Sequence, residues 1–233
     1  MTWPGGKNGS GAYQRIINYM PPHKVYIEPF LGSGAVLRNK RPAERNVGID
    51  KSAEAISLCL KLGVDQSITS LFQDDALALL PGLDTMLADP RLIDRPDTLV
   101  YADPPYLMET RRSGELYEHE LSDQEHETLL EILLGARCMV MISGYRSALY
   151  DDALKLWHRV DYQASTRRGM VNESLWMNFA PPSQLHDYAH LGDGFRERER
   201  IKRKKERWAG KIARMDRLER LAVMEALQNV NSG

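Results

Sequence analysis

Four residues at the end of an apolar run form the most unusual stretch of the sequence. Asp103, Pro104, Pro105 and Tyr106 follow the apolar residues 98–101 after a single alanine. A proline fixes its own φ angle and donates no hydrogen bond to a sheet, so two in succession end a strand and stiffen the chain. An acid and an aromatic ring on such a stiff segment are candidates for ligand chemistry. The competing interpretation is an ordinary strand-ending turn, because Pro-Pro is common in loops.

A second group of residues suits a ligand that carries a sugar or a negative charge. The stretch EPFLGSGA contains Gly32 and Gly34, which let the backbone approach a ligand at a helix N-terminus. Leu37 stands where a dinucleotide fingerprint has its third glycine, so a tight turn without a ligand is the alternative. Asp50 ends the next apolar run, where a carboxylate accepts both hydroxyls of a ribose, caps the following helix, or does both.

The stretch GGKNGSG near the N-terminus places Lys7 among glycines and close to Trp3. It lacks the full pattern of a phosphate-binding loop. A lysine on a glycine hinge beside an aromatic ring suits a small carboxylate instead. The alternative is an N-terminus without a binding role.

The elements between these motifs alternate between strands and helices. Helices are expected in the intervals after the first, second, fourth and fifth strands, and the last two strands follow each other with no helix between them, so they pair antiparallel. The sequence therefore predicts an α/β, Rossmann-like fold with a mostly parallel sheet and helices on both faces. In such sheets ligands bind beyond the carboxyl ends of the strands, where residues 28–34, Asp50, Asp74/Asp75 and residues 103–106 converge. The predicted strands are residues 24–29, 46–50, 67–73, 98–103, 138–143, 158–165 and 173–179.

Composition excludes several classes of protein. The chain has 233 residues, of which 42% are hydrophobic, enough for one sizeable core, and no run of them has the length of a membrane span. The N-terminal residues lack the apolar core of a signal peptide. Cys59 and Cys138 lie in apolar segments, and neither they nor the scattered histidines have a metal-binding spacing. We therefore expect a cytoplasmic protein without a metal or a membrane partner.

The motifs WPGGK, EPFLGSG, GID and ADPPY occur in the same order as in a known family. Together they resemble the Dam-type (D12 class) DNA adenine methyltransferases, which use S-adenosylmethionine, and the resemblance extends from Trp3 to about Phe179. It implies a site-specific enzyme that flips an adenine out of double-stranded DNA and methylates its exocyclic amine, as in restriction-modification systems. The methyltransferase domain is expected at residues 1–183, and a linker with a charged amphipathic helix at residues 184–233.

The resemblance also assigns roles to individual residues. Trp3 and Lys7 would contact the methionine end of the cofactor, with Lys7 on its carboxylate, and Asp50 would hold the ribose. Either Asp74 or Asp75 would reach its adenine, and Asp75 is the one included in the predicted cofactor site. The cofactor set is therefore Trp3, Lys7, Phe30, Gly32, Ser33, Gly34, Asp50, Asp75 and Asp103.

The same resemblance gives the segment 103–106 a chemical purpose. The amine of adenine is a poor nucleophile because its lone pair is delocalised into the ring. The Asp103 side chain and the Pro104 carbonyl would accept both amine hydrogens and favour a pyramidal nitrogen, and the prolines hold these acceptors in place. Tyr106 would stack on the flipped base, which contributes about 1–3 kcal/mol. The expected catalytic residues are thus Asp103, Pro104, Pro105 and Tyr106.

The chain departs from the family in its target-recognition region. Family members usually carry a substantial insert before the strand that leads to the DPPY motif, and only a short interval occurs in this chain. Two arginine-containing loops are the candidates for DNA contact, and their alternative is a solvated loop without that role. These candidates are Arg111, Arg112, Arg167 and Arg168.

Other activities compete with this interpretation. The same pocket could methylate an exocyclic amine of RNA, or of cytosine in DNA. Methylation of a ring carbon needs a cysteine nucleophile, and neither Cys59 nor Cys138 lies in a suitable loop. A protein-glutamine methyltransferase would more often have Asn in place of Asp103. A non-catalytic nucleic-acid-binding subunit is the remaining alternative.

The C-terminal segment is strongly basic. Between Phe195 and Arg220 there are 12 Lys and Arg against 5 Asp and Glu, whereas the whole chain has a net charge of −1. Apolar residues spaced mostly by three, four or seven predict one amphipathic helix through this segment. Its positive charge would face DNA phosphates. The alternative is a helix that packs on its own domain or mediates self-association.

Overall fold

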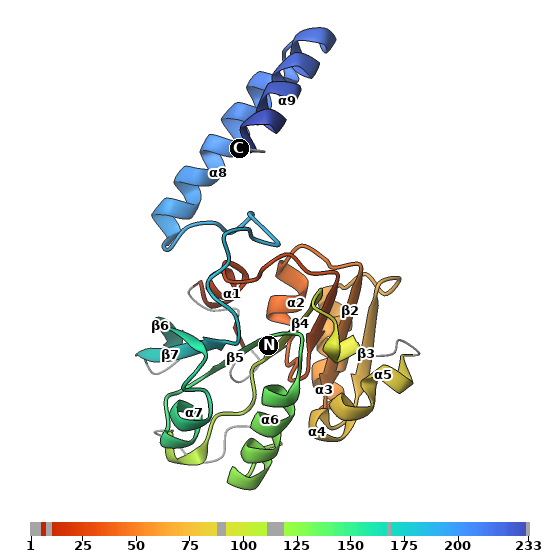
Figure 1. Ribbon diagram of the computed structural model, residues 1–233, viewed down its shortest axis with the longest axis vertical. Coiled ribbons are helices and arrows are strands. Elements are labelled where there is room, and N and C mark those ends of the chain that lie inside the picture. The colour runs from red at the N-terminus through yellow and green to blue at the C-terminus, as the bar shows by residue number, and fades with distance from the viewer. Residues whose placement is uncertain (1–5, 8–10, 88–91, 111–118, 167–168, 232–233) are drawn as a thin grey trace. The chain divides into compact units, whose positions relative to one another are not determined.

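The computed structural model describes residues 6–7, 11–87, 92–110, 119–166 and 169–231. The chain forms two compact units, residues 1–188 and residues 189–233. The first unit holds a sheet, and the second is helical (Figure 1).

The sheet of the first unit has seven strands in the described residues, in the order β3-β2-β1-β4-β5-β7-β6. The strands β3, β2, β1, β4 and β5 pair in parallel in this order, whereas β7 pairs antiparallel with both β5 and β6. The predicted mostly parallel sheet with a final antiparallel pair is therefore confirmed. The strands are β1 Val25–Glu28, β2 Arg45–Asp50, β3 Thr69–Gln73, β4 Thr98–Ala102, β5 Met139–Gly144, β6 His158–Thr166 and β7 Gly169–Met177.

The strand order has a topological switch point between β1 and β4. After β3 the chain crosses back and adds β4 on the other side of β1, so neighbouring connections leave the sheet in opposite directions there. Every residue of β1 and β4 is buried, as expected for central strands covered on both faces. The switch point is thus the place where this fold offers a crevice.

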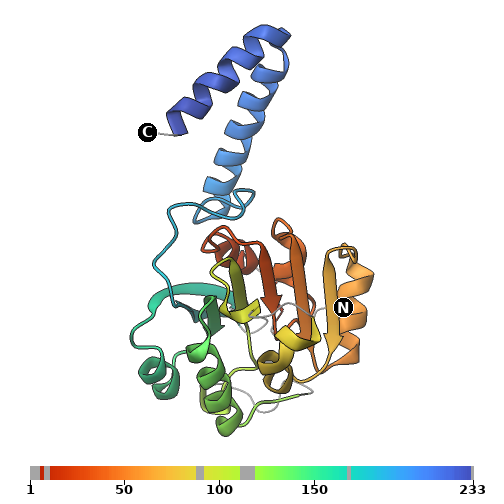
Figure 2. The ribbon, with the colours of Figure 1, turned by 45° about the vertical axis from the view of Figure 1, so that its right-hand side comes forward.

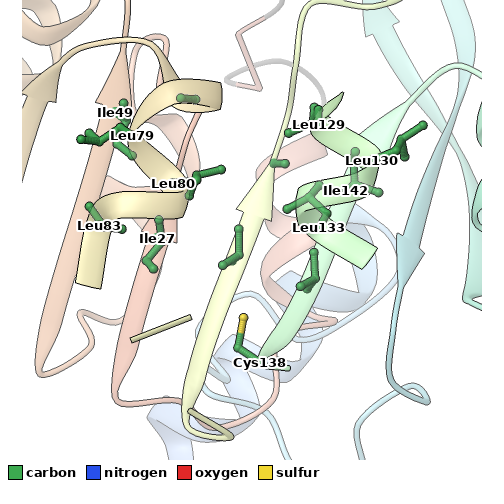
Figure 3. Packing of buried hydrophobic residues seen from close by; sticks show 14 of the residues in the cluster. Ile27, Ile49, Leu79, Leu80, Leu83, Leu129, Leu130, Leu133, Cys138 and Ile142 are labelled. Carbon is green, nitrogen blue, oxygen red and sulfur yellow. The ribbon is translucent and has the colours of Figure 1, made fainter. Parts of the chain in front are cut away.

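Two hydrophobic clusters lie on the two faces of the sheet. On one face, Ile27, Ile49 and Ile142 pack under side chains from α4, α5, α6 and α7 (Figure 3). On the other, Tyr26, Leu99 and Met141 pack under α1, α2 and α3. Side chains alternate between the two faces along each strand, which is why neighbouring residues such as Tyr26 and Ile27 belong to different clusters.

The helices of the first unit begin at polar caps that the sequence places there. Ser52 caps α3, Asp75 caps α4, and Ser122 forms a capping box with Glu125 at the start of α6. The helices are α1 Ala12–Ile17, α2 Ala35–Asn39, α3 Ala53–Leu62, α4 Ala76–Leu79, α5 Leu83–Met86, α6 Asp123–Gly135 and α7 Ala148–Ala153, with short 3-10 turns at Leu80–Gly82, Leu92–Asp94 and Met108–Thr110.

The second unit contains two helices where one continuous helix was predicted. Helices α8 (Phe195–Ala213) and α9 (Arg217–Asn231) form a hairpin (Figure 2). The prediction is wrong because Asp216 acts as a helix cap, its Oδ1 accepting hydrogen bonds from the backbone N–H groups of Leu218 and Glu219 at 2.9 and 3.0 Å. An aspartate that bonds to the backbone ahead of it favours a new helix start over a continued helix.

No helix in the described part of the chain is both long enough and apolar enough to span a membrane.

Candidate active site

The turn between β1 and α2 depends on its glycines. Gly32 and Gly34 have φ angles of 50° and 65°, a left-handed conformation that side chains disfavour. A Cβ atom added at Gly34 would lie 2.6 Å from the Cys59 sulfur. The turn can therefore pack against α3 only with a glycine at this position.

Asp50 holds this turn from the end of the neighbouring strand. Its Oδ2 accepts a hydrogen bond from the Gly32 N–H at 2.7 Å, and its Oδ1 accepts one from the Ser52 N–H at 2.9 Å. Each carboxylate oxygen keeps further lone pairs. The side chain thus has a fixed orientation, set by two backbone donors, and can still accept hydrogen bonds from a ligand.

A pocket opens at the carboxyl ends of β1, β2, β3 and β4, at the switch point. The empty space among its lining residues, with the open solvent at the mouth included, is about 1130 Å³. Phe30, Leu31 and Val36 supply apolar wall, and Asp50, Lys51 and Ser52 are among its polar lining residues. Eight of the residues predicted from the motifs line it together: Lys7, Phe30, Gly32, Ser33, Asp50, Asp75, Asp103 and Pro105.

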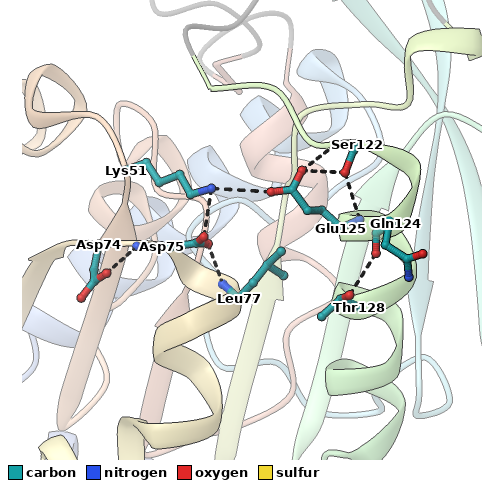
Figure 4. A network of polar contacts seen from close by, with 8 residues as sticks. All are labelled: Lys51, Asp74, Asp75, Leu77, Ser122, Gln124, Glu125 and Thr128. Atoms are coloured by element: carbon teal, nitrogen blue, oxygen red, sulfur yellow. Dashed lines mark hydrogen bonds and ion pairs between the residues drawn. The ribbon is translucent and has the colours of Figure 1, made fainter.

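An ion-pair bridge borders the pocket on the side of α4 and α6 (Figure 4). The Lys51 ammonium lies 3.0 Å from Asp75 and 3.9 Å from Glu125, and all three side chains are partly exposed. Asp75 also accepts from the Leu77 N–H as the cap of α4. Asp74, in contrast, bonds to the backbone N–H of Asp75 and is not among the pocket-lining residues. The geometry thus favours Asp75 over Asp74 as the residue within reach of a ligand.

A buried charged cluster lies at the end of the pocket formed by Lys7 and Asp103. The Lys7 ammonium is 2.9 Å from Asp103 Oδ1 and 3.3 Å from Glu173 Oε2, and it also donates a hydrogen bond to the Tyr106 hydroxyl. Glu173 in turn accepts from the Tyr162 hydroxyl at 2.8 Å, across the register pair that joins β6 to β7. One cation between two carboxylates leaves the cluster with one net negative charge.

The contacts of Asp103 are asymmetric. Besides Lys7, the Ser143 hydroxyl donates to Oδ1 at 2.6 Å and the Tyr106 hydroxyl donates to the same atom at 3.3 Å. The Tyr101 hydroxyl and Ser143 Oγ are also hydrogen-bonded, at 2.9 Å. In the part of the chain that the structure describes, none of these contacts falls on Oδ2. Three donors therefore fix the carboxylate through one oxygen and leave the other as an acceptor.

Burial controls ionisation in this cluster. Burial raises the pKa of Asp103, and the negative charge of Glu173 adds to this effect while Lys7 opposes it. Burial alone would lower the pKa of Lys7, but the facing carboxylates of Asp103 and Glu173 raise it well above its usual value. Lys7 thus stays charged at neutral pH, and the Asp103 carboxylate is a better proton acceptor than a surface aspartate.

Tyr106 lies beside the pocket but does not line it. Its ring centroid is 4.4 Å from that of Tyr145, and the Lys7 ammonium lies 5.0 Å from its centre. Pro105 lines the pocket, whereas Pro104 is buried behind it. The predicted catalytic segment thus reaches the pocket through Asp103 and Pro105.

Glu28 forms a second buried carboxyl at the pocket wall. Burial raises its pKa to about 8, although hydrogen bonds donated by the Tyr26 hydroxyl and the Leu37 N–H to its Oε2 oppose this shift. Glu28 is therefore protonated over much of the range below neutral pH, and it ties the end of β1 to α2.

Several residues of the site were not among the predicted ones. Lys51 and Glu125 are charged residues next to predicted helix starts, a common surface pattern that gives no functional signal. Ser143 and Glu173 are polar residues close to apolar runs in their strands, and this contrast could have identified them. Tyr162 lies in a mostly polar strand, which gives no such signal.

Some predicted residues cannot be compared with the structure. Trp3, Arg111, Arg112, Arg167 and Arg168 lie outside the described residues. Gly34 shapes the turn without lining the pocket. Among the described residues, no group of three or more His, Cys, Asp or Glu side chains could hold a metal ion.

Together the fold and the pocket define an α/β protein with a ligand site at its topological switch point. No protein-family model and no curated protein matches the chain. A conserved hypothetical protein from Streptococcus pyogenes is similar in structure, with 14% identity and a TM-score of 0.49 over 76% of this chain and 99% of that one.

Two further similar structures are named for an activity. A SAM-dependent methyltransferase from Agrobacterium tumefaciens has 13% identity and a TM-score of 0.46, over 72% of this chain and 60% of that one. An rRNA methylase from Streptococcus thermophilus has 13% identity and a TM-score of 0.43, over 71% and 93%. Because all three TM-scores are below 0.5, function must be argued from the site itself.

Proposed function

We propose that this chain is an S-adenosylmethionine-dependent methyltransferase that acts on the exocyclic amine of adenine in double-stranded DNA. The observation that carries the proposal is the arrangement of Asp103, whose Oδ1 is held by three donors while Oδ2 remains as an acceptor beside the pocket. The order of the WPGGK, EPFLGSG and ADPPY motifs supports the same activity.

The donor and acceptor set of the pocket fits this cofactor. Asp50, oriented by two backbone N–H groups, would accept hydrogen bonds from the ribose hydroxyls. Phe30 and Leu31 offer apolar surface, and Asp75 would accept from the amine of the cofactor's adenine. The net negative charge of the cluster around Lys7 favours a positively charged sulfonium nearby.

The expected contact between Lys7 and the cofactor's carboxylate is part of the proposal, with a condition that the geometry adds. An ammonium has three hydrogens, and those of Lys7 face Asp103, Glu173 and the Tyr106 hydroxyl. A ligand carboxylate would have to replace one of these partners. The permanent role of Lys7 is then to hold Asp103 in place.

The bound cofactor would supply an electrophilic methyl group on a sulfonium. Asp103 Oδ2 and the Pro104 carbonyl would accept the two amine hydrogens of the target base, which draws the nitrogen lone pair out of conjugation and toward the methyl group. The nitrogen would take the methyl group while the sulfur keeps the electron pair of the S–C bond as a neutral thioether, and the Asp103 carboxylate, whose pKa burial raises, or water would accept the proton that the nitrogen loses. Tyr106 would stack on the base once the base displaces part of its present packing against Tyr145.

The test is methyl transfer itself. The protein is incubated with S-adenosylmethionine carrying a labelled methyl group and with unmethylated duplex DNA, and the DNA is digested to nucleosides. We expect the label in N6-methyl-deoxyadenosine, and a loss of about 100-fold or more in Asp103→Asn, since a removed acceptor at a preorganised site has that scale of effect. Asp123→Asn, a matched change at the exposed start of α6, should keep full activity.

Each other outcome points to a stated alternative. Label in cytosine, or in RNA but not DNA, would replace adenine in DNA as the substrate while keeping the cofactor. Nucleic-acid binding without any transfer would favour the non-catalytic subunit. Near-normal single-turnover methylation by Asp103→Asn would refute the mechanism.

A further inference from the structure

One side of helix α8 carries a continuous row of basic side chains. With about 100° of rotation per residue, six of them fall within an arc of about 100°. All six are exposed, and they extend over about 22 Å along the helix axis. We call this set the basic stripe: Arg196, Arg200, Arg203, Lys204, Arg207 and Lys211.

The acidic residues of α8 lie outside the stripe. Glu197, Glu199 and Glu206 project from the rest of the helix circumference by the same rotation. Arg200 pairs with Glu197 at 3.2 Å, but their side chains are 65% and 43% exposed, and such surface pairs contribute little. The stripe therefore keeps most of its positive charge.

The apolar side of α8 belongs to the contact with α9 and does not overlap the basic stripe. Ile201 and Ile212 are half-buried, and α8 and α9 are in contact (Figure 2). The stripe lies on another side of the helix, where each of its six side chains is exposed, while Trp208 on the apolar side also remains 51% exposed.

The charge of the chain is divided between its two units. Residues 1–188 contain 19 Lys and Arg against 25 Asp and Glu, whereas residues 189–233 contain 12 against 7. A polyanionic substrate is thus repelled by the unit that holds the pocket and attracted by the other. Duplex DNA carries one negative charge per about 1.7 Å, or about 13 charges along the length of the stripe.

We propose that the basic stripe of α8 binds the phosphate backbone of duplex DNA and so supplies the affinity that the short target-recognition region lacks. DNA is then the partner of the proposed methyltransferase, so the purpose of this binding rests on the proposed function. The test measures binding alone and does not depend on that function. Four of the six side chains are arginines, whose planar fork matches phosphate oxygens in a bidentate way. Phosphate contacts of this kind give affinity and position without reading the base sequence.

The test compares two pairs of lysines on the same helix in the full-length protein. Lys204→Gln with Lys211→Gln removes two charges from the stripe, and Lys202→Gln with Lys205→Gln removes two charges from outside it. Both pairs cause the same change in net charge and length of side chain. Because Lys211 also lies 5.0 Å from the centre of the Trp208 ring, thermal unfolding is used to show that each variant is folded.

Binding of a labelled DNA duplex is measured by fluorescence anisotropy without cofactor, from about 50 to 200 mM salt. Each lost phosphate contact reduces the slope of log affinity against log salt by about 0.9, so the stripe pair should flatten the slope by about 1.8. Over this fourfold rise in salt, the wild-type protein should therefore lose affinity by a factor about 12 times larger than the factor lost by the stripe-pair variant. The control pair should show less than half of that effect.

The proposal is overturned if the two pairs have equal effects, since only net charge would then matter, or if neither changes the slope. It is also overturned if the stripe pair leaves DNA binding intact but abolishes binding to anionic phospholipid vesicles, or changes the mass in sedimentation. Failure of methyl transfer leaves this result untouched, because the assay contains no cofactor and counts only bound duplex.

Discussion

Replacement of Lys7 by methionine should destabilise the protein in a way that grows with pH. Lys7 is the cation between the buried carboxylates of Asp103 and Glu173, and methionine keeps the length of its side chain while removing the charge. Without the ammonium, two buried carboxylates face each other across an apolar group. Burial and the negative charge of Glu173 then both favour the protonated form of Asp103.

The magnitude follows from the distances. At an effective dielectric constant of about 20, a charge pair at 2.9 Å is worth about 6 kcal/mol and one at 3.3 Å about 5 kcal/mol. Desolvation of Lys7 and repulsion between the carboxylates offset most of this attraction. The net loss on removing one partner of a buried pair is about 3–5 kcal/mol, which we expect at about pH 8.

The sign of the pH dependence comes from the carboxyl groups. The pKa of Lys7 is raised well above its usual value, so its contribution in the wild type is constant through neutral pH and is lost only in strong alkali. Burial already raises the folded-state pKa of Asp103, and in Lys7→Met the opposing effect of the ammonium is lost, so this pKa rises further. The stabilising contribution of Asp103 is therefore complete at acidic pH and disappears as pH rises through the raised value, so the deficit is smallest near pH 5.

The assay is urea unfolding at several pH values, followed by circular dichroism, with Lys24→Met as the matched change of an exposed lysine. Lys24→Met should change the free energy of unfolding by less than about 0.5 kcal/mol at every pH. Lys7→Met with Glu173→Gln leaves a single carboxyl and should recover part of the loss. A deficit that is independent of pH, or largest in acid, would refute this account of the cluster.

Three further outcomes are expected. S-adenosylmethionine at about 100 times its dissociation constant should stabilise the protein by about 2.7 kcal/mol, a shift of about 5–10 °C in thermal unfolding, and Asp50→Ala should reduce it; an unchanged melting curve would exclude the cofactor. Gly34→Ala should lower the free energy of unfolding in urea by about 1–3 kcal/mol more than Gly63→Ala does. Both glycines have positive φ, but only at Gly34 would an added Cβ lie 2.6 Å from the Cys59 sulfur. Equal losses would contradict the close packing of this turn. Glu28→Gln should flatten the pH dependence of the free energy of unfolding between about pH 4.5 and 8 by up to about 1.4 kcal/mol per pH unit. The reason is that Glu28, with its pKa near 8, loses stabilising protonation as pH rises through this window. Parallel curves for the two proteins would show that Glu28 ionises normally.

The sheet and the edge that holds the pocket are predictable because their signals are local. The parallel strands contain short apolar runs, and polar or glycine residues at or shortly after their carboxyl ends mark this edge, such as Gly32, Asp50 and Asp103. The rule that ligands gather at this edge then brings together residues far apart in the chain. For this reason Asp50 and Asp103 could be placed near one another without a structure, whereas Lys7 was assigned to the same site only by the resemblance to the methyltransferase family.

The charged cluster and the C-terminal hairpin depend on information that is not local. Glu173 meets Lys7 only because the register of β6 and β7 places it opposite Tyr162, and a shift by one residue would turn it to the other face. The break between α8 and α9 depends on which of two hydrogen-bonding patterns Asp216 adopts, cap or solvated surface. Periodicity alone favours the continuous helix and does not decide between them.

The two buried cysteines can report how often each layer of the molecule opens. Cys59 belongs to the cluster on one face of the sheet, behind the Gly34 turn, and Cys138 belongs to the cluster on the other face. Burial raises the pKa of Cys59 to about 11 and that of Cys138 to about 12, so neither thiol reacts while its layer is closed. The rate at which a thiol reagent modifies each one therefore measures how often that layer opens, and the ratio of the two rates shows whether the layers open together or separately.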